Sequence, residues 1–194
     1  MPSVVPAWIE RAVEGEKIAA KLTAAKVAQE GDLGRGGFSL SSPAFRHGQE
    51  LDPSFTAAEE DAVAPPLEWT APPPGTHELA LVVEDAASGR VHWLVWGLAP
   101  QRGKLLEGET PPRAGKNALG NSEWLLPDPP LGEEHIYVFQ LFALDLPLAL
   151  LPGATHADLL AAMKGHVTAV ALLASRFEGH EIEELDAADF DGFE

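Results

Sequence analysis

Apolar residues gather in three runs in the middle of the chain, and each run has the composition of a β-strand. The runs are HELALVVED (77–85), RVHWLVW (90–96) and EHIYVFQLFAL (134–144), which are rich in Val, Ile, Trp, Phe and Tyr. Several are apolar on both faces, as central strands of a layered or sandwiched sheet are. No alternation of helix and strand is visible, which disfavours a Rossmann or barrel α/β fold. The pattern predicts a mainly β domain.

Residues 7–30 have a helical pattern instead. Ala, Lys and Glu are frequent, and apolar residues stand four positions apart in the pairs Ile9/Val13 and Ile18/Leu22. The apolar stripe is narrow. We therefore expect a helix that packs weakly on the main domain or on a second subunit, where it would support a homodimer.

A second helix is predicted over residues 156–174. Thr155 fits the N-cap position, and Asp158 stands three residues later as in a capping box. Apolar residues then recur at helical spacing, which is typical of a helix that packs on the core. These residues are Leu159, Met163, Val167, Val170 and Leu173.

Glycine and proline divide the chain into three parts. The segment GDLGRGG (31–37) holds four glycines in seven residues, which disfavours a regular helix. The whole chain holds 17 prolines and 18 glycines, and after residue 37 these residues separate short apolar runs. We expect an N-terminal helical extension over residues 1–36, one domain over residues 37–178 and an acidic tail over residues 179–194.

The charge balance is strongly acidic. Thirty acids face 13 bases, for a net charge of −17, which argues against nucleic acid as a partner and against anionic membrane surfaces. The last 14 residues hold seven acids and no base. This composition is typical of a solvated tail; the alternative is a docking segment that uses Phe190 and Phe193.

Three further features bound the class of protein. No stretch of about 18 apolar residues is present, so no integral membrane segment is expected. The N-terminus lacks a basic leader followed by an apolar block, so a cytoplasmic location is expected. The absence of cysteine excludes disulfides, thiolate metal sites and cysteine nucleophiles.

Polar side chains stand near one end of each predicted strand: Asp85 in the first, His92 in the second, and His135 with Tyr137 in the third. If their faces converge, these side chains line one pocket. There His and Tyr would donate hydrogen bonds to an anion, and the carboxylate would orient an imidazole. Strand alternation predicts these shared faces: Leu79, Leu81, Val83 and Asp85; His92, Leu94 and Trp96; His135 and Tyr137.

The sequence gives little support for a metal site or for a known catalytic motif. Two histidines and Asp85 could bind a metal as a two-His-one-carboxylate triad, although their spacing has no specific signature. The chain contains no nucleophile elbow, no phosphate-binding loop and no H-E-x-x-H motif.

Five segments match, in order, the motifs of one known family. They are FSLSSPAFRHGQEL (38–51), APPLEW (64–69), HWLVW (92–96), GKNALGNSEWLLPDPPLGEEHIYVFQLFALD (115–145) and KGHVTAVALLASRF (164–177). Together they resemble the phosphatidylethanolamine-binding protein family, and most closely its bacterial Raf kinase inhibitor-like branch. The resemblance implies a β-sandwich-like fold, with a large central antiparallel sheet, a smaller sheet and a C-terminal helix. The N-terminal helix is an addition to it.

The resemblance also implies a small pocket at one edge that accepts phosphate, acetate or a phospholipid headgroup. The chain departs from two family motifs: D-P-D-A-P is DAASG here, and G-P-C-P-P looks like LPDPP, with Asp128 near the rim. The residues that match the family's pocket are Asp85, His92 and Trp93 of the H-W segment, Pro129, Pro130, and His135 and Tyr137 of the H-x-Y pair.

Three functions follow from these features. The leading one is a non-enzymatic protein that binds a small anion or headgroup, or that regulates a partner as a kinase or protease inhibitor does. It needs no catalytic residue, cofactor or metal. The second is a metal-dependent or hydrolytic enzyme on a β-sandwich or jelly-roll scaffold. The third is an interaction protein that docks through the helix in residues 7–30 or the acidic tail.

Overall fold

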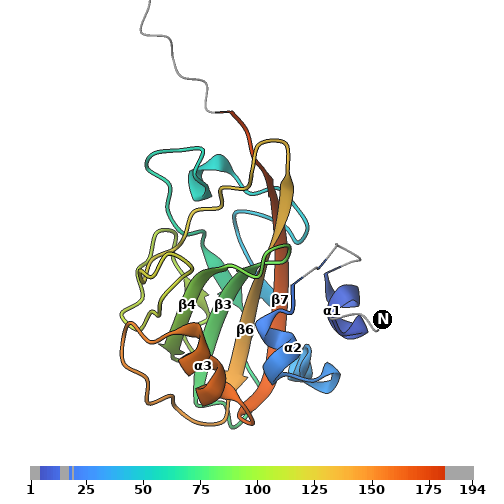
Figure 1. Cartoon of the computed structure of the whole chain (residues 1–194). Coiled ribbons are helices and arrows are strands. Elements are labelled where there is room, and N and C mark those ends of the chain that lie inside the picture. Colours follow the sequence, from blue (N-terminus) through green and yellow to red (C-terminus); the bar gives the residue numbers. More distant parts are fainter. Residues whose placement is uncertain (1–4, 14–17, 19, 182–194) are drawn as a thin grey trace, which may run out of the picture.

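The main structural feature is a four-stranded antiparallel sheet with layers on both faces (Figure 1). The computed structural model describes residues 5–13, 18 and 20–181. Among these, the sheet has the order β4-β3-β6-β7. Its strands are β3 (Glu78–Asp85), β4 (Val91–Leu98), β6 (Glu134–Leu144) and β7 (Val167–Glu178). The fold class expected from the sequence, mainly β with two antiparallel sheets, is confirmed.

A smaller antiparallel sheet covers one face of the main sheet. Its order is β1-β2-β5. The core between the two sheets is apolar and includes Leu67 and Leu105 of the small sheet and Leu81 and Phe139 of the main sheet. The strands are β1 (Leu40–Ser41), β2 (Leu67–Trp69) and β5 (Lys104–Leu105).

Helices and the N-terminal segment cover the other face of the main sheet (Figure 1). The second apolar core lies here, and it includes Leu22, Leu159 and Met163 against Val82 and Phe142 of the sheet. The helices are α1 (Ala7–Ala12), α2 (Thr23–Val27) and α3 (His156–Met163); short 3-10 turns span Glu30–Asp32, Arg35–Gly37 and Pro53–Phe55.

The single helix expected over residues 7–30 is wrong. The structure has α1 and α2 instead, and residues 14–17 and 19 lie outside the described residues. The weak packing expected of this segment is also wrong, because Ile9, Val13 and Leu22 are fully buried. Helix propensity is overridden here because the chain follows the sheet to bury these side chains.

Buried polar groups fix α2 to the sheet. The Glu84 carboxylate accepts hydrogen bonds from the backbone N–H of Thr23 (2.8 Å) and from Gln140 Nε2 (2.6 Å). Gln140 Oε1 accepts in turn from the backbone N–H of Ala24 (2.8 Å). Buried polar groups need such partners to offset their loss of water. The start of α2 is thus tied to β3 and β6.

The helix predicted over residues 156–174 is correct only in its first half. Thr155 and Asp158 form the expected capping box, but α3 ends at Met163. Gly165 then adopts a left-handed conformation (φ 81°), and the chain continues as β7, which pairs with β6 along nearly its whole length. Of the predicted tail, residues 182–194 lie outside the described residues.

Candidate functional site

The site lies at one end of the main sheet, where β3 ends and where β4 and β6 begin. Asp85 is the last residue of β3, and it stands opposite Tyr137 in the register between β3 and β6. His135 precedes Tyr137 by two residues and therefore shares its face. Simple alternation thus brings Asp85, His135 and Tyr137 together, as predicted.

His92 reaches the same face by a different route. Val83 pairs with Trp93, and the next residue, Glu84, pairs with Val91. His92 is therefore the extra residue of a β-bulge, which redirects its side chain. Its imidazole contacts the Tyr137 ring edge-on, with centroids 5.0 Å apart.

The expectation that His92 shares a face with Leu94 and Trp96 is wrong. Both of these residues point into the core beneath the helices, whereas His92 lines the cavity on the opposite face. Alternation assumes one residue per partner residue, and the bulge breaks that rule.

A cavity of about 590 Å³ opens at this end of the sheet, a volume within the usual range for small-molecule sites. The predicted residues Asp85, His92, Pro129, Pro130, His135 and Tyr137 all line it. Trp93 does not line it. The other lining residues are Ala57, Ser88, Arg90, Leu119, Asn121, Glu123, Trp124, Leu125, Leu126 and Asp128.

Trp93 lies next to the cavity, behind Trp124. The two indole rings meet edge-on, with centroids 5.7 Å apart, and both line a smaller neighbouring cavity of about 210 Å³. Trp124 is held by a hydrogen bond from its Nε1 to the Phe55 carbonyl oxygen (3.0 Å). Trp93 therefore supports the cavity wall and does not form it.

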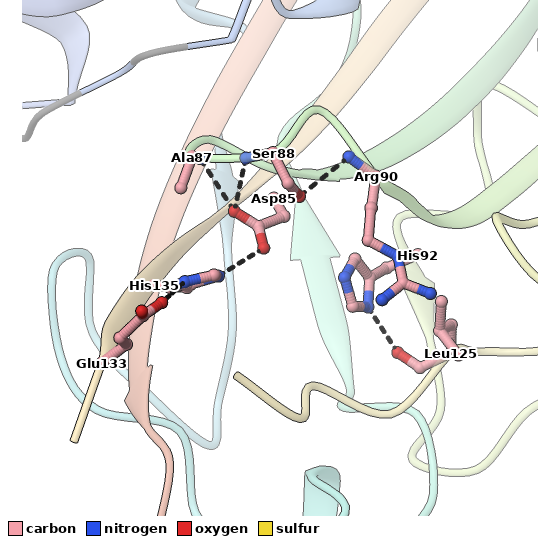
Figure 2. Close-up of polar contacts among 8 residues, drawn as sticks. All are labelled: Asp85, Ala87, Ser88, Arg90, His92, Leu125, Glu133 and His135. Carbon is pink, nitrogen blue, oxygen red and sulfur yellow. Dashed lines mark hydrogen bonds and ion pairs between the residues drawn. The ribbon is translucent and has the colours of Figure 1, made fainter. Parts of the chain in front are cut away.

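Asp85 orients His135 and not His92 (Figure 2). His135 Nδ1 lies 2.7 Å from Asp85 Oδ2, and its Nε2 lies 3.1 Å from Glu133 Oε2. The second oxygen of Asp85 accepts hydrogen bonds from the backbone N–H groups of Ala87 (2.8 Å) and Ser88 (3.3 Å). The Asp85 carboxylate thus closes the turn between β3 and β4 and holds the imidazole.

This environment favours the charged form of His135. Burial would lower the pKa of the His135 imidazole, but the hydrogen bonds and charges of Asp85 and Glu133 outweigh it and raise the pKa above its usual value. Since both ring nitrogens are engaged by carboxylates, His135 presents no free nitrogen to the cavity.

His92 has the opposite character. Its Nδ1 lies 2.7 Å from the Leu125 carbonyl oxygen (Figure 2), and its Nε2 has no hydrogen-bond partner among the described residues. Burial lowers the pKa of the imidazole, and the positive charge of Arg90 acts in the same direction. His92 is therefore neutral at pH 7, with one nitrogen available to a ligand.

Tyr137 offers a hydroxyl to the cavity. The side chain is 1% exposed, and its hydroxyl has no hydrogen-bond partner among the described residues. Burial, with the charges of Asp85 and Asp128, raises the pKa of Tyr137 well above its usual value. The hydroxyl therefore keeps its proton and can donate it in a hydrogen bond.

Arg90 is the positively charged lining residue that the sequence analysis did not identify. It is exposed at the start of the chain's return into β4, beside His92 (Figure 2). Its guanidinium forms no ion pair with the described residues. The sequence feature that could have indicated its role is its position two residues before His92, a predicted pocket residue.

The described part of the chain offers neither a metal site nor a membrane-spanning helix. No three His, Asp or Glu side chains gather there in a way that could hold a metal ion. None of the helices described is long and apolar enough to span a membrane.

Two antiparallel sheets packed face to face, with a cavity lined by polar and apolar side chains at the end of the main sheet, define a β-sandwich protein with a ligand-sized site. Comparison with known proteins makes the class specific. The model of the phosphatidylethanolamine-binding protein family matches residues 41–178. The chain belongs to this family, as the sequence motifs predicted.

Bacterial relatives agree with this assignment. The chain is 39% identical over 149 residues to LppC of Mycobacterium tuberculosis, which its name classes as a lipoprotein; the match covers 73% of this chain and 72% of LppC. It is 34% identical over 148 residues to a protein of Chlamydia muridarum named UPF0098, with 72% and 97% covered.

Solved structures show the same fold. The homologue CT736 of Chlamydia trachomatis has a TM-score of 0.69 at 31% identity, with 74% of this chain and 98% of that chain covered. YbcL of Escherichia coli has a TM-score of 0.66 at 22% identity, with 74% and 99% covered.

Proposed function

We propose that this chain is a non-enzymatic protein that binds a small oxyanion, free or as part of a phospholipid headgroup, at the end of its main sheet. The observation that carries the proposal is that three polar groups face one cavity without a hydrogen-bond or ion-pair partner among the described residues. They are the Arg90 guanidinium, the Tyr137 hydroxyl and His92 Nε2. Ligand sites commonly combine apolar walls with a few such convergent polar groups.

Each group has a distinct part in binding. Arg90 supplies the positive charge and several N–H donors, which suit the oxygens of phosphate or carboxylate. Tyr137 supplies a neutral donor at the buried end of the cavity. Pro129 and Pro130 line the cavity, and, without a backbone N–H, they add no hydrogen-bond donor to it.

The pairing of His135 argues against a role for this histidine as a general base. A histidine that acts as a general base needs one ring nitrogen free to take a proton from the nucleophile. Here Asp85 and Glu133 engage both nitrogens. The pair therefore serves to shape the cavity and to fix the turn that carries Arg90.

The location and partners of the chain stay predictions. The cytoplasmic location rests on the sequence alone, and one relative, LppC, is named a lipoprotein. Regulation of a kinase or protease rests on the family resemblance, and so does a phospholipid headgroup as the ligand.

Titration of the full chain with phosphate or phosphoethanolamine, followed by NMR of the imidazole groups, tests the proposal. At millimolar ligand we expect the His92 signals to shift, because its Nε2 faces the cavity. The signals of His166, which is bonded to Asp145 at 2.9 Å and lines none of the cavities described above, serve as an internal control. Unmoved His92 signals at these concentrations would contradict the proposal.

A further inference from the structure

His92 presents a lone pair, and not a proton, to the cavity. A carbonyl oxygen can only accept, so the contact of 2.7 Å between Nδ1 and the Leu125 oxygen places the ring proton on Nδ1. In the neutral imidazole the other nitrogen, Nε2, is then an acceptor. The backbone N–H of Leu125 donates to the His92 carbonyl oxygen in return (2.8 Å), so this geometry is fixed from two sides.

The surroundings of His92 preserve this state. The side chain is 4% exposed, and burial disfavours the charged imidazolium. The ionisable and charged groups that face it from the neighbouring segments are Asp85 of β3, Arg90 of the turn, His135 and Tyr137 of β6, and Glu123 and Asp128 of the loop before β6.

We infer that the cavity selects an oxyanion that still carries a proton, namely the monoanion of phosphate or of a phosphomonoester. The ligand O–H would donate to His92 Nε2, while its charged oxygens would accept hydrogen bonds from the Arg90 guanidinium and the Tyr137 hydroxyl. The inference rests on the proposed anion site and narrows its ligand class.

The acidic rim favours the same ligand. Glu123 and Asp128 line the cavity together with Arg90, so one cation faces two carboxylates that are not neutralised by an ion pair among the described residues. A dianion is repelled by these carboxylates more than a monoanion is. A ligand ammonium group could also donate a hydrogen bond to Nε2. It would lie beside the Arg90 guanidinium, however, and the two positive charges would repel each other.

A series of matched anions at about pH 6 tests the inference on the full chain, since the second pKa of a phosphomonoester lies near 6. About half of the methyl phosphate then carries the proton, whereas dimethyl phosphate has a single charge without it, and sulfate is a dianion. Calorimetry should show methyl phosphate binding about ten- to hundredfold more tightly than the other two, because they leave the buried acceptor unpaired.

Two more ligands separate the sources of the phosphomonoester. Inorganic phosphate represents the free ion, and a short-chain phosphatidic acid represents a lipid headgroup. Both should bind at about pH 6. As the pH rises by two units, binding of the phosphatidic acid should weaken more, because it loses its last proton, whereas the inorganic phosphate dianion keeps one. Tighter binding of the phosphatidic acid than of methyl phosphate would assign the lipid source, and equal binding would assign small monoesters.

The variant His92→Gln adds a second readout. Its amide can donate as well as accept, so methyl phosphate and dimethyl phosphate, which carry the same charge, should bind with similar affinity. The ligand series on the unaltered chain decides the question if this variant fails to fold. Sulfate or dimethyl phosphate binding as tightly as methyl phosphate would overturn the inference and leave the anion site standing. Failure of every anion to bind would instead overturn the proposed function.

Discussion

At the scale of single residues, the polar groups of the site fall into two sets with different partners. Asp85, His135 and Glu133 satisfy one another, whereas the side-chain donors of Arg90 and Tyr137 have no partner in the described part of the chain. A sequence shows which residue types are present and which strand face they share, but not which of them pair. For this reason the cavity could be predicted from Asp85, His135 and Tyr137. Which of its polar groups pair with each other, and which remain available to a ligand, could not be predicted.

The role of Arg90 can be tested by the substitution Arg90→Gln. It removes the one positive charge without an ion pair among the cavity-lining residues described, so phosphate binding should weaken about tenfold, as expected for a lost hydrogen bond to a charged group. Calorimetric titration measures the change. Arg46→Gln is the matched control, because Arg46 is exposed, has no ion pair among the described residues and lies outside the cavity. Equal affinities in both variants would argue against a role for Arg90.

The contact of His135 with Glu133 predicts that the stability of the folded state depends on pH. Glu133→Gln removes one of the two carboxylates that raise the pKa of His135, so NMR titration should find a lower pKa in the variant. A raised pKa in the folded state stabilises the protein fully below the unfolded value of about 6.5 and ceases to do so as the pH rises through the folded value.

The stability difference between the unaltered chain and Glu133→Gln should therefore be largest below about pH 6 and vanish at alkaline pH. Urea unfolding at several pH values measures it. Glu107→Gln, at an exposed residue without an ion pair in the described part of the chain, controls for the change in net charge. A difference that grows with pH would contradict the assignment.

At the scale of elements, the sequence predicts features that depend on neighbouring residues and does not predict those that depend on distant partners. The start of α3 was predicted because the Thr155–Asp158 capping box lies within four residues. Its end was not, because residues 167–178 pair with β6, whose sequence lies about 30 residues earlier. The bulge at His92 has the same cause: it depends on the register against β3, which no short stretch of sequence specifies.

The change from α3 to β7 depends on Gly165, which gives a prediction for Gly165→Ala. A Cβ there would meet open space, but φ is 81°, and the left-handed conformation costs an alanine about 1–2 kcal/mol. Urea unfolding should show a loss of stability of this size. Gly31→Ala is the control, since Gly31 has no positive φ and its Cβ would make only an ordinary contact. Equal stability of the two variants would show that the turn relaxes.

At the scale of the whole molecule, the chain adds a layer to the family domain. The family match begins at residue 41, so α1 and α2 lie outside it, yet they cover a face of the main sheet. The buried contacts of Glu84 and Gln140 with the start of α2 belong to this added layer. Assembly of two copies through the N-terminal segment stays a prediction, and many apolar side chains of its described residues are already buried within the chain.

If this layer is part of the folding unit, Leu22→Ala should destabilise the whole protein. Leu22 is fully buried, and removing such a side chain costs about 2–5 kcal/mol. Urea unfolding followed by tryptophan fluorescence measures the loss. Leu151→Ala, at a side chain that is 80% exposed, should change stability by less than about 0.5 kcal/mol. A small effect at Leu22 would mean that the segment opens independently of the sheets.

The position of Tyr137 has a practical consequence. It is the single tyrosine of the chain, and its hydroxyl end faces the cavity next to His92. Protein labelled with fluorotyrosine would therefore give one fluorine resonance, assigned without any mutagenesis, from the wall of the site. Because few other molecules in a cell contain fluorine, this resonance could report occupancy of the cavity in an unfractionated extract. Fractions of that extract could then be screened for the natural ligand with the protein as its own sensor.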